Sequence, residues 1–261
     1  MQNNLKILFI GDIIGKTGRN ALSREMKFLK ENYSPDLIIA NGENLAGGFG
    51  MTGSTTEAVF ASGVNILTSG NHIWDNKEYA FLLRDERILR PLNYNPSLPG
   101  KGYGIYRIND MDVCVANLCG RIFMQPLDCP FRKMDELLQN IKTKIIIVDF
   151  HAEATAEKQA FAFYLDGRVS AVIGTHTHCQ TADERILRNG TAFITDAGMT
   201  GSIESIIGFE PEGAIRRTLL QVPQRFEVAK ENAAVNAIFL EIDPSTGKTL
   251  SLERIFKYVK D

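Results

Sequence analysis

The chain has 261 residues, of which 44% are hydrophobic and 23% are charged, and its formal net charge is −2 with a pI of about 6.1. This composition is typical of a globular protein, and we expect a single domain over residues 1–261 that buries a substantial core. The small net charge excludes a broad basic field, so we expect no strong nucleic-acid binding. No apolar run approaches the ~20 residues of a membrane span, so we expect no membrane partner.

The first third of the chain alternates between apolar runs and helical patterns. We expect strands at residues 5–10, 37–40 and 65–68, and helices at about 17–32, from Ser54 or Thr55 onward, and at 76–84. Ser54 followed by Glu57 fits a capping box at the start of the second helix. Such an alternation is typical of an α/β fold with parallel strands.

The rest of the chain adds antiparallel pairs to this pattern. We expect strands at 103–108, 112–118, 144–150, 169–173, 185–187, 191–195, 234–242 and 249–258, and helices at about 133–141 and 154–165. Asn189-Gly190 is a strong signal for a type I′ hairpin, and Asn109-Asp110 and residues 243–247 mark two further hairpins. The simplest architecture is α/β, with two mixed β-sheets packed as a sandwich and flanked by helices.

The four cysteines, Cys114, Cys119, Cys129 and Cys179, do not form a metal-binding motif. None of them has Cys-x-x-Cys spacing, so a zinc ribbon is not indicated. We expect reduced, partly buried thiols in a cytoplasmic protein. A thiolate ligand at Cys179, directly after His178, is the minor alternative.

Five of the apolar runs end in residues that are able to bind a metal ion. The segments after them are Gly11-Asp12, Asn41-Gly42-Glu43-Asn44, Ser69-Gly70-Asn71-His72, His151 and Gly174-Thr175-His176-Thr177-His178. All four histidines of the chain are in this set. Because sites in α/β sheets form outside the carboxyl ends of the strands, these distant residues can meet on one edge. The coincidence indicates a metal site.

The candidate ligands are nitrogen and oxygen donors: Asp12, Glu43, Asn44, Asn71, His151, His176 and His178. This set exceeds the usual protein ligands of one ion but suits two ions that share a bridging carboxylate. Imidazole with carboxylate and amide oxygen favours Mn, Fe or Zn over Ca or Cu. Two divalent ions, two carboxylates and a bridging hydroxide leave one net positive charge, which complements a phosphodiester and indicates phosphoryl transfer.

These segments resemble the calcineurin-like metallophosphoesterases, whose strand-end motifs are D-x-H, G-D, G-N-H, H and G-H-x-H. The corresponding positions here are Asp12-Ile13-Ile14, Gly42-Glu43-Asn44, Gly70-Asn71-His72, His151 and His176-Thr177-His178. The chain is similar to the YmdB-like bacterial branch, which shares the Gly-Asp-Ile-Ile-Gly, Asn-Gly-Glu-Asn, Gly-Asn-His-Ile-Trp and Thr-Asp-Ala-Gly-Met-Thr-Gly segments. The resemblance spans nearly the whole chain and implies the αββα sandwich of that superfamily.

Two positions depart from the wider family. Ile14 replaces the histidine of D-x-H, and Glu43 replaces the bridging aspartate. The YmdB-like branch has the same changes, and there the asparagine after the glutamate takes a metal-ligand role. The resemblance therefore implies that the amide oxygen of Asn44 replaces the lost imidazole. One harder ligand favours Fe or Mn, with Zn and Mg as further candidates.

The resemblance also implies two divalent metal ions and a role for each residue. The first ion would bind Asp12, Glu43, Asn44 and His178, and the second would bind Glu43, Asn71, His151 and His176. A metal-bridging hydroxide would attack phosphorus in line, and His72 would protonate the leaving oxygen. The implied substrates are cyclic nucleotides such as 2′,3′-cAMP. Asp75 either orients His72 or is the N-cap of a helix, and the N-cap is favoured.

Three other functions stay open. Residues 48–53 satisfy the dinucleotide fingerprint G-x-G-x-x-G, but a polar stretch separates them from the preceding strand, and we expect a loop beside the metals. The second alternative is a nucleotide- or RNA-binding regulatory protein with a metal site and little turnover. The third is amide hydrolysis by a binuclear centre. A homo-oligomer is compatible with the sequence.

A few polar and aromatic residues have no assigned place in this scheme. Asp196 either supports the site or forms a turn, without preference. We expect surface roles for Arg19, Arg121 and Arg132, and core positions for Trp74 and Phe123.

Overall fold

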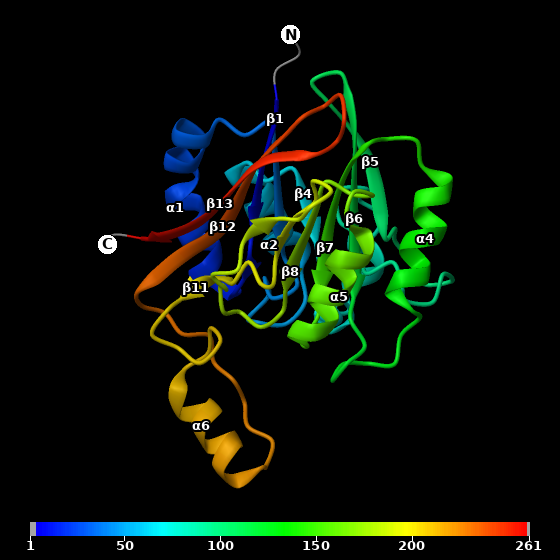
Figure 1. Ribbon diagram of the computed structural model, residues 1–261. Coiled ribbons are helices and arrows are strands. Elements are labelled where there is room, and N and C mark those ends of the chain that lie inside the picture. Colours follow the sequence, from blue (N-terminus) through cyan, green and yellow to red (C-terminus); the bar gives the residue numbers. More distant parts are fainter. Residues whose placement is uncertain (1–3, 260–261) are drawn as a thin grey trace.

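Two mixed β-sheets lie face to face, with helices on both outer faces (Figure 1). The computed structural model describes residues 4–259. The first sheet has seven strands: β1 (Leu5–Ile10), β2 (Asp12–Ile13), β3 (Leu37–Asn41), β4 (Ile66–Thr68), β11 (Met199–Ser202), β12 (Ala233–Ile242) and β13 (Thr249–Tyr258). The second has six: β5 (Tyr103–Ile108), β6 (Met111–Cys119), β7 (Ile145–His151), β8 (Ala171–Thr175), β9 (Arg185–Ile186) and β10 (Ala192–Ile194).

Both sheets mix parallel and antiparallel pairs. The first has the order β2-β11-β12-β1-β3-β4, in which β1, β3 and β4 are parallel and β12 runs antiparallel to β1. The second has the order β5-β6-β7-β8-β10-β9, in which the four inner strands are parallel and both edge strands are antiparallel. The predicted α/β sandwich of two mixed sheets is therefore confirmed.

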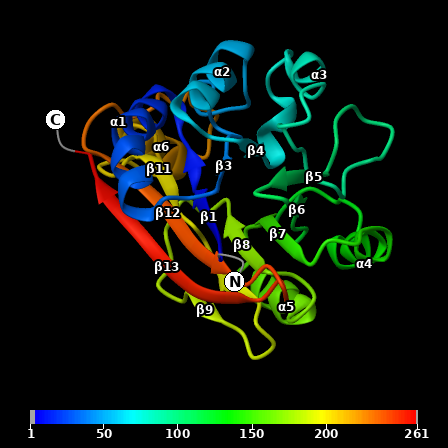
Figure 2. The same cartoon turned by 90° about the horizontal axis from the view of Figure 1, so that it is seen from above.

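Helices cover each sheet on the side away from the other (Figure 2). Helices α1 (Gly15–Tyr33) and α2 (Gly53–Ser62) pack on the first sheet, and α4 (Pro130–Asn140) and α5 (Thr155–Leu165) pack on the second. Two short elements, the 3-10 helix η1 (Asn71–Trp74) and α3 (Tyr79–Leu82), follow β4. None of the helices among residues 4–259 combines the length and apolar character that a membrane crossing requires.

Side chains alternate in direction along the central strands and divide the core into three layers. In β1, Leu5, Ile7 and Phe9 face the space between the sheets. Leu8 and Ile10 of the same strand pack under the helices of the first sheet. Strand β7 alternates in the same way between the central layer and the layer under α4 and α5. Burial on both faces explains why these runs are almost continuously apolar.

The helix predicted at residues 76–84 is wrong in extent, because only Tyr79–Leu82 is α-helical. The side chain of Asn76 accepts a hydrogen bond from the backbone N–H of Glu78 at 3.1 Å. Asparagine side chains that bond the backbone in this way favour turns over helices. The segment after β4 therefore turns before it becomes helical.

The capping box of α2 is also placed differently from the prediction. Thr52 is the N-cap, with an extended backbone, and its side chain and that of Thr55 cap each other's backbone N–H groups. The predicted pair, Ser54 and Glu57, lies inside the helix, which begins at Gly53. The helix therefore starts before the position that the sequence pattern indicated.

The hairpin of β9 and β10 is confirmed, but its predicted type I′ turn is wrong. Of the two predicted turn residues only Gly190 has a positive φ, 102°. The N–H of Leu187 donates to the carbonyl of Thr191 at 2.8 Å, and that of Gly190 donates to the carbonyl of Leu187 at 3.0 Å. These bonds form a longer loop with glycine in the left-handed position.

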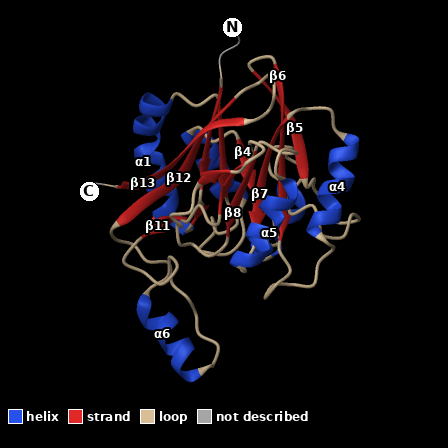
Figure 3. Ribbon diagram, viewed as in Figure 1, coloured by secondary structure: helices blue, strands red, loops and turns tan. Residues whose placement is uncertain are grey.

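Besides the 3-10 helix η1, three elements have no counterpart in the sequence prediction. Strands β2 and β11 pair in parallel, with Asp12 opposite Met199. Helix α6 (Pro211–Leu220) belongs to an excursion between β11 and β12 that stands away from both sheets (Figure 3). Its packing is sparse, since Ala214 is its only buried residue. An isolated short helix of this kind carries little periodic apolar signal.

Gly174 in β8 lies so close to the neighbouring backbone that no side chain fits there. A Cβ atom at this position would lie 1.8 Å from the carbonyl oxygen of Thr195. We expect Gly174→Ala to lower the free energy of unfolding by about 1–3 kcal/mol or more, because the two backbones must separate. Urea denaturation of the variant and the wild type measures this loss.

The matched control is Gly53→Ala at the start of α2. A Cβ atom there would meet only the Oε2 atom of Glu78, at 3.6 Å, so we expect no loss of stability. Equal stability of Gly174→Ala and the wild type would contradict the close packing of β8 against the residues after β10.

Candidate metal centre

The polar residues at five strand ends converge on one edge of the two sheets. Two groups of side chains come close enough to hold a metal ion: Asp12, Glu43 and His178, and Glu43, His151 and His176. Within each group the potential ligand atoms lie within 4.8 Å of one another. Glu43 belongs to both groups, which is the position of a residue that bridges two ions.

Several hydrogen-bond acceptors converge on Nε2 of His151. Oε1 of Glu43 and Oδ1 of Asn71 both lie 3.1 Å from this nitrogen, and Nδ1 of His176 lies at 3.0 Å. The other nitrogen of His176 lies 3.2 Å from a carboxylate oxygen of Glu153. The tautomer of His176 that has its proton on that nitrogen presents a lone pair at Nδ1. A cation, either a proton or a metal ion, satisfies such a set of acceptors.

Among the buried acceptors of residues 4–259 that lack a hydrogen-bond partner, two belong to this cluster. They are Oδ1 of Asp12 and Oδ1 of Asn44. The amide nitrogen of Asn44 donates to the carbonyl of Gly48 at 2.8 Å, so its oxygen is the free atom. Unsatisfied buried acceptors are costly unless an ion or another donor binds them. The residues present thus fit a metal centre.

Burial and mutual charge determine the pKa values in this cluster. Burial raises the pKa of Asp12 well above its usual value. Burial alone would lower the pKa of His151, but the charges of Glu43 and Asp12 raise it to about 9. Burial alone would raise the pKa of Glu43, but the charge of His151 and its hydrogen bond lower the pKa of Glu43 to about 2. Burial and His151 together lower the pKa of His176 to about 3, so that this imidazole is neutral.

Asp149 is the centre of a buried network that orients His151. Its Oδ1 atom accepts a hydrogen bond from the hydroxyl of Thr175 at 2.7 Å, and that hydroxyl lies 2.9 Å from Nδ1 of His151. Because the hydroxyl donates to Asp149, it accepts the proton of Nδ1, and Nε2 is left for the cluster. The Oδ2 atom of Asp149 accepts from Asn41 at 2.9 Å and from Thr68. Such partners fix the tautomer and orientation of a ligand histidine.

Sequence analysis missed this network. A usable signal was present, because an acidic residue inside an apolar run such as Ile145–His151 is seldom buried without partners. The partners themselves come from β3, β4 and β8, and the sequence does not show which positions on these strands face Asp149.

Asp196 supports the loop that carries His176 and His178. Both histidines have positive φ, 104° and 66°, a costly backbone conformation outside glycine. Oδ2 of Asp196 accepts the N–H of Thr177 at 3.0 Å and an ion pair from Lys158 at 2.7 Å. Asp196 and Lys158 are both fully buried. The structure shows both of the roles left open for Asp196, since Oδ2 supports this loop and Oδ1 accepts the N–H of Gly198 at 2.9 Å in a turn.

His72 lies beside the cluster with one ring nitrogen engaged. Nδ1 of His72 lies 2.7 Å from Oδ2 of Asp75, and its backbone N–H donates to Glu43 at 3.1 Å. Asp75 is the C-cap of η1, whereas the N-cap of α3 is Glu78, so the favoured role of Asp75 as a helix N-cap is wrong. The ring of Phe49 meets that of His72 edge to face, with centroids 5.1 Å apart. Nε2 of His72 remains for another partner.

Two of the remaining predictions are wrong. Arg19 is half-buried and donates to the carbonyl of Leu45, so it is not a solvated surface residue. Phe123 is 88% exposed with a φ of 61°, at a turn, so it is not in the core. Trp74 is partly buried and packs on the core under the first sheet.

Arg121 and Arg132 are exposed, as expected. All four cysteines are free, but only Cys129 is partly buried, because Cys114 and Cys119 are fully buried and Cys179 is exposed. Cys179 lies outside both groups of potential ligands.

We expect Lys158→Met to lower the free energy of unfolding by about 3–5 kcal/mol, because it leaves the carboxylate of Asp196 buried without its counter-charge. The matched control is Arg168→Met, which breaks the partly exposed ion pair of Arg168 with Asp135 and should cost about 1 kcal/mol or less. Urea denaturation at neutral pH compares the two. Similar costs would contradict a special role for the buried pair.

Comparison with known proteins agrees with this geometry. Residues 8–255 match the family model described as YmdB-like protein. The chain is 45% identical over 254 residues to the 2′,3′-cyclic-nucleotide 2′-phosphodiesterase of Bacillus subtilis strain 168, and the match covers 96% of each protein.

Two crystal structures superpose on nearly the whole chain. A phosphatase of Mycoplasma pneumoniae matches with a TM-score of 0.95 and 38% identity, over 99% of this chain and 95% of that one. A hypothetical protein from Thermus thermophilus matches with a TM-score of 0.93 and 42% identity, over 97% and 99%. The chain therefore belongs to the YmdB-like protein family, and its fold is that of the metallophosphoesterase-like proteins.

Proposed function

We propose that this protein is a metal-dependent phosphodiesterase that hydrolyses 2′,3′-cyclic nucleotides at a dinuclear centre. Membership of the YmdB-like family and the name of the Bacillus subtilis relative support the reaction and the substrate class. The observation that carries the proposal is the convergence of Glu43, Asn71 and His176 on Nε2 of His151, within 3.0–3.1 Å. A cation that binds between them stabilises hydrogen-bond acceptors that lie so close together.

In this proposal the two groups of side chains each hold one divalent ion. One ion binds Asp12, Glu43, Asn44 and His178, and the other binds Glu43, Asn71, His151 and His176. The free acceptor atoms of Asp12 and Asn44 support the first set. Bound divalent ions would polarise the phosphoryl oxygens and lower the pKa of a water molecule, which is the chemistry that two-metal phosphoesterases use.

His72 supplies the proton in this proposal. A ribose oxygen that leaves phosphorus needs a proton, because an alkoxide is a poor leaving group. Asp75 holds Nδ1 of His72 at 2.7 Å, so the opposite nitrogen is directed away from this carboxylate. The side chain of His72 is 27% exposed, which leaves room for a substrate to approach. These contacts support a role for His72 as a general acid that does not itself bind an ion.

Fe or Mn is the proposed metal, with Zn and Mg as alternatives. Two amide oxygens stand among the proposed ligands, and oxygen ligands suit these harder ions better than a purely imidazole set would. The charge of the two carboxylates leaves the loaded centre positive and attractive to a phosphodiester. No thiolate takes part, since Cys179 lies outside both groups.

We expect chelator treatment to abolish hydrolysis of bis(p-nitrophenyl) phosphate, and Mn²⁺, or Fe²⁺ under anaerobic conditions, to restore it. Asn71→Ala should lose at least about tenfold in the restored rate, because it removes one proposed ligand. The control is Asn140→Ala, an exposed amide on α4, which should behave as the wild type. Rate measurements and metal analysis of each variant give the result.

Two bound ions per chain without turnover, with either metal, would contradict hydrolysis. That outcome would favour the regulatory alternative, in which the protein binds a nucleotide or RNA with little turnover.

We expect His72→Asn to affect substrates according to their leaving groups. Hydrolysis of 2′,3′-cAMP should fall by about 10²–10⁴-fold in kcat, because the ribose oxygen needs the proton. Hydrolysis of bis(p-nitrophenyl) phosphate should change far less, because p-nitrophenolate leaves without protonation. Steady-state rates on both substrates, with metal content verified, measure the difference. The same loss on both substrates would show that His72 is not the acid.

A further inference from the structure

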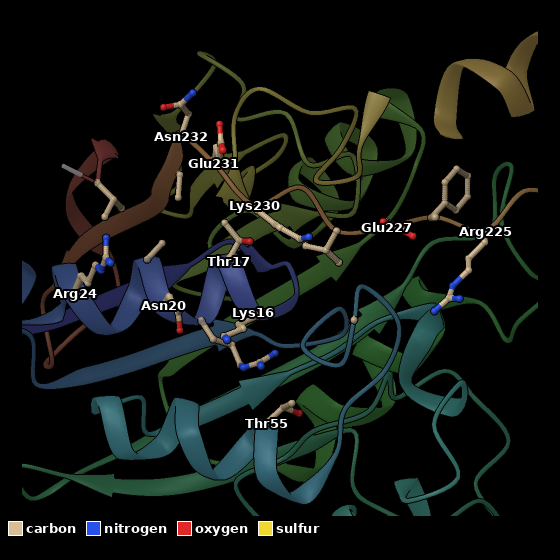
Figure 4. A pocket seen from close by; sticks show the side chains of 17 residues that line it. Lys16, Thr17, Asn20, Arg24, Thr55, Arg225, Glu227, Lys230, Glu231 and Asn232 are labelled. Carbon is tan, nitrogen blue, oxygen red and sulfur yellow. The ribbon is translucent and has the colours of Figure 1, made fainter. Parts of the chain in front are cut away.

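A cavity of about 900 Å³ lies between α1 and the chain that leads from α6 into β12. Lys16, Asn20 and Arg24 of α1 line one side, and residues 225–228 and 230–232 line the other (Figure 4). Thr17 joins the two sides, since its hydroxyl donates to the carbonyl of Ala229 at 2.7 Å. None of the potential metal-binding residues contributes to this lining.

The cavity is strongly basic although the chain as a whole is not. Its basic lining residues are Lys16, Arg19, Arg24, Arg225 and Lys230, against two acidic ones, Glu227 and Glu231. None of these five cations forms an ion pair with a carboxylate of residues 4–259. The chain has a net charge of −2, so this concentration of unpaired positive charge is local. Such clusters attract and bind phosphate groups.

The cavity also has the size and the apolar wall that a nucleoside needs. Pockets for small ligands usually span roughly 300–1,000 Å³. Phe226 and Val228 line it, and the ring of Phe226 is only partly buried. Its centroid lies 5.1 Å from that of Phe209, and the guanidinium carbon of Arg217 lies over the ring at 5.1 Å, so the ring is held in place. The part of the ring that stays exposed offers an apolar contact for a base.

We propose that this cavity binds a nucleotide with more than one phosphate charge, at a site separate from the metal centre. The phosphates lie among Lys16, Arg24 and Lys230, and the base lies against Phe226. This site goes beyond the hydrolytic function proposed above and does not depend on it.

The cavity adjoins the segment that carries Asn44. Gly47 lines it, and Arg19 reaches from it to the carbonyl of Leu45. The carbonyl of Asn44 accepts the N–H of Gly15, the first residue of α1, at 2.9 Å. A nucleotide in the cavity therefore contacts the same helix and loop that hold one side of the metal centre.

The test is isothermal titration of the full-length chain with ADP, at low salt, both as purified and after chelator treatment. We expect saturable binding with the same Kd in both states. Arg24→Glu and Lys230→Glu should each weaken it by about tenfold or more, because each removes a charge-assisted contact. Lys27→Glu is the matched control, since Lys27 lies on α1 outside the cavity with its side chain 85% exposed. It should leave the Kd unchanged.

Four outcomes would overturn the proposal. The first is that ADP does not bind. The second is that Lys27→Glu raises the Kd of ADP as much as Arg24→Glu does, because the attraction would then come from the general charge of the surface. The third is that one part of ADP binds as tightly as ADP itself: equal affinity for adenosine would show that the phosphates are not recognised, and equal affinity for pyrophosphate would show that the nucleoside is not recognised. The fourth is binding lost on chelation or in Asn71→Ala but kept in Arg24→Glu, which would place ADP at the metal centre. Circular dichroism of each variant verifies folding, and the readout requires no turnover.

Discussion

The rest of the structure depends on the cost of burying several acceptors around one nitrogen. Nε2 of His151 faces Glu43, Asn71 and His176 at about 3 Å in a fully buried position. Lone pairs so close together repel each other in a medium of low dielectric constant unless a positive charge lies among them. The scaffold must therefore hold these groups around such a charge, whether it is a proton on His151 or a bound ion, and rigid strands can do so.

Both sheets hold these groups in place, and hydrogen bonds between the sheets fix the distance across the cluster of acceptors. Glu43 follows a strand of the first sheet, whereas His151 ends a strand of the second. Directly beneath them, Asn41 of the first sheet donates to Asp149 of the second at 2.9 Å. On the far side, the buried pair of Lys158 and Asp196 holds the strained histidine loop. The site thus lies where the sandwich is cross-linked by polar contacts instead of apolar packing.

The sequence predicts the features that topology determines and misses those that depend on three-dimensional register. Apolar runs give the strands, and the rule that parallel strands present their carboxyl ends together brings Asp12, Glu43 and His151 to one edge. The same rule does not show that Asp149 faces Asn41, because that contact depends on which positions of packed elements face each other. Phe123 was misplaced for a related reason, since hydrophobicity does not reveal a turn.

The departure at Ile14 is explained by the surroundings of that position. Ile14 is fully buried, and its side chain packs so closely on Gly208 that a Cβ there would lie 2.7 Å from it. An imidazole in this apolar place, at the base of the excursion that carries α6, would have its polar atoms buried without partners. Asn44 lies in the loop after β3, where the carbonyl of Gly48 holds its amide nitrogen and leaves the oxygen free. Ile14 therefore packs against the base of the excursion as an apolar side chain, and Asn44 supplies an oxygen donor instead.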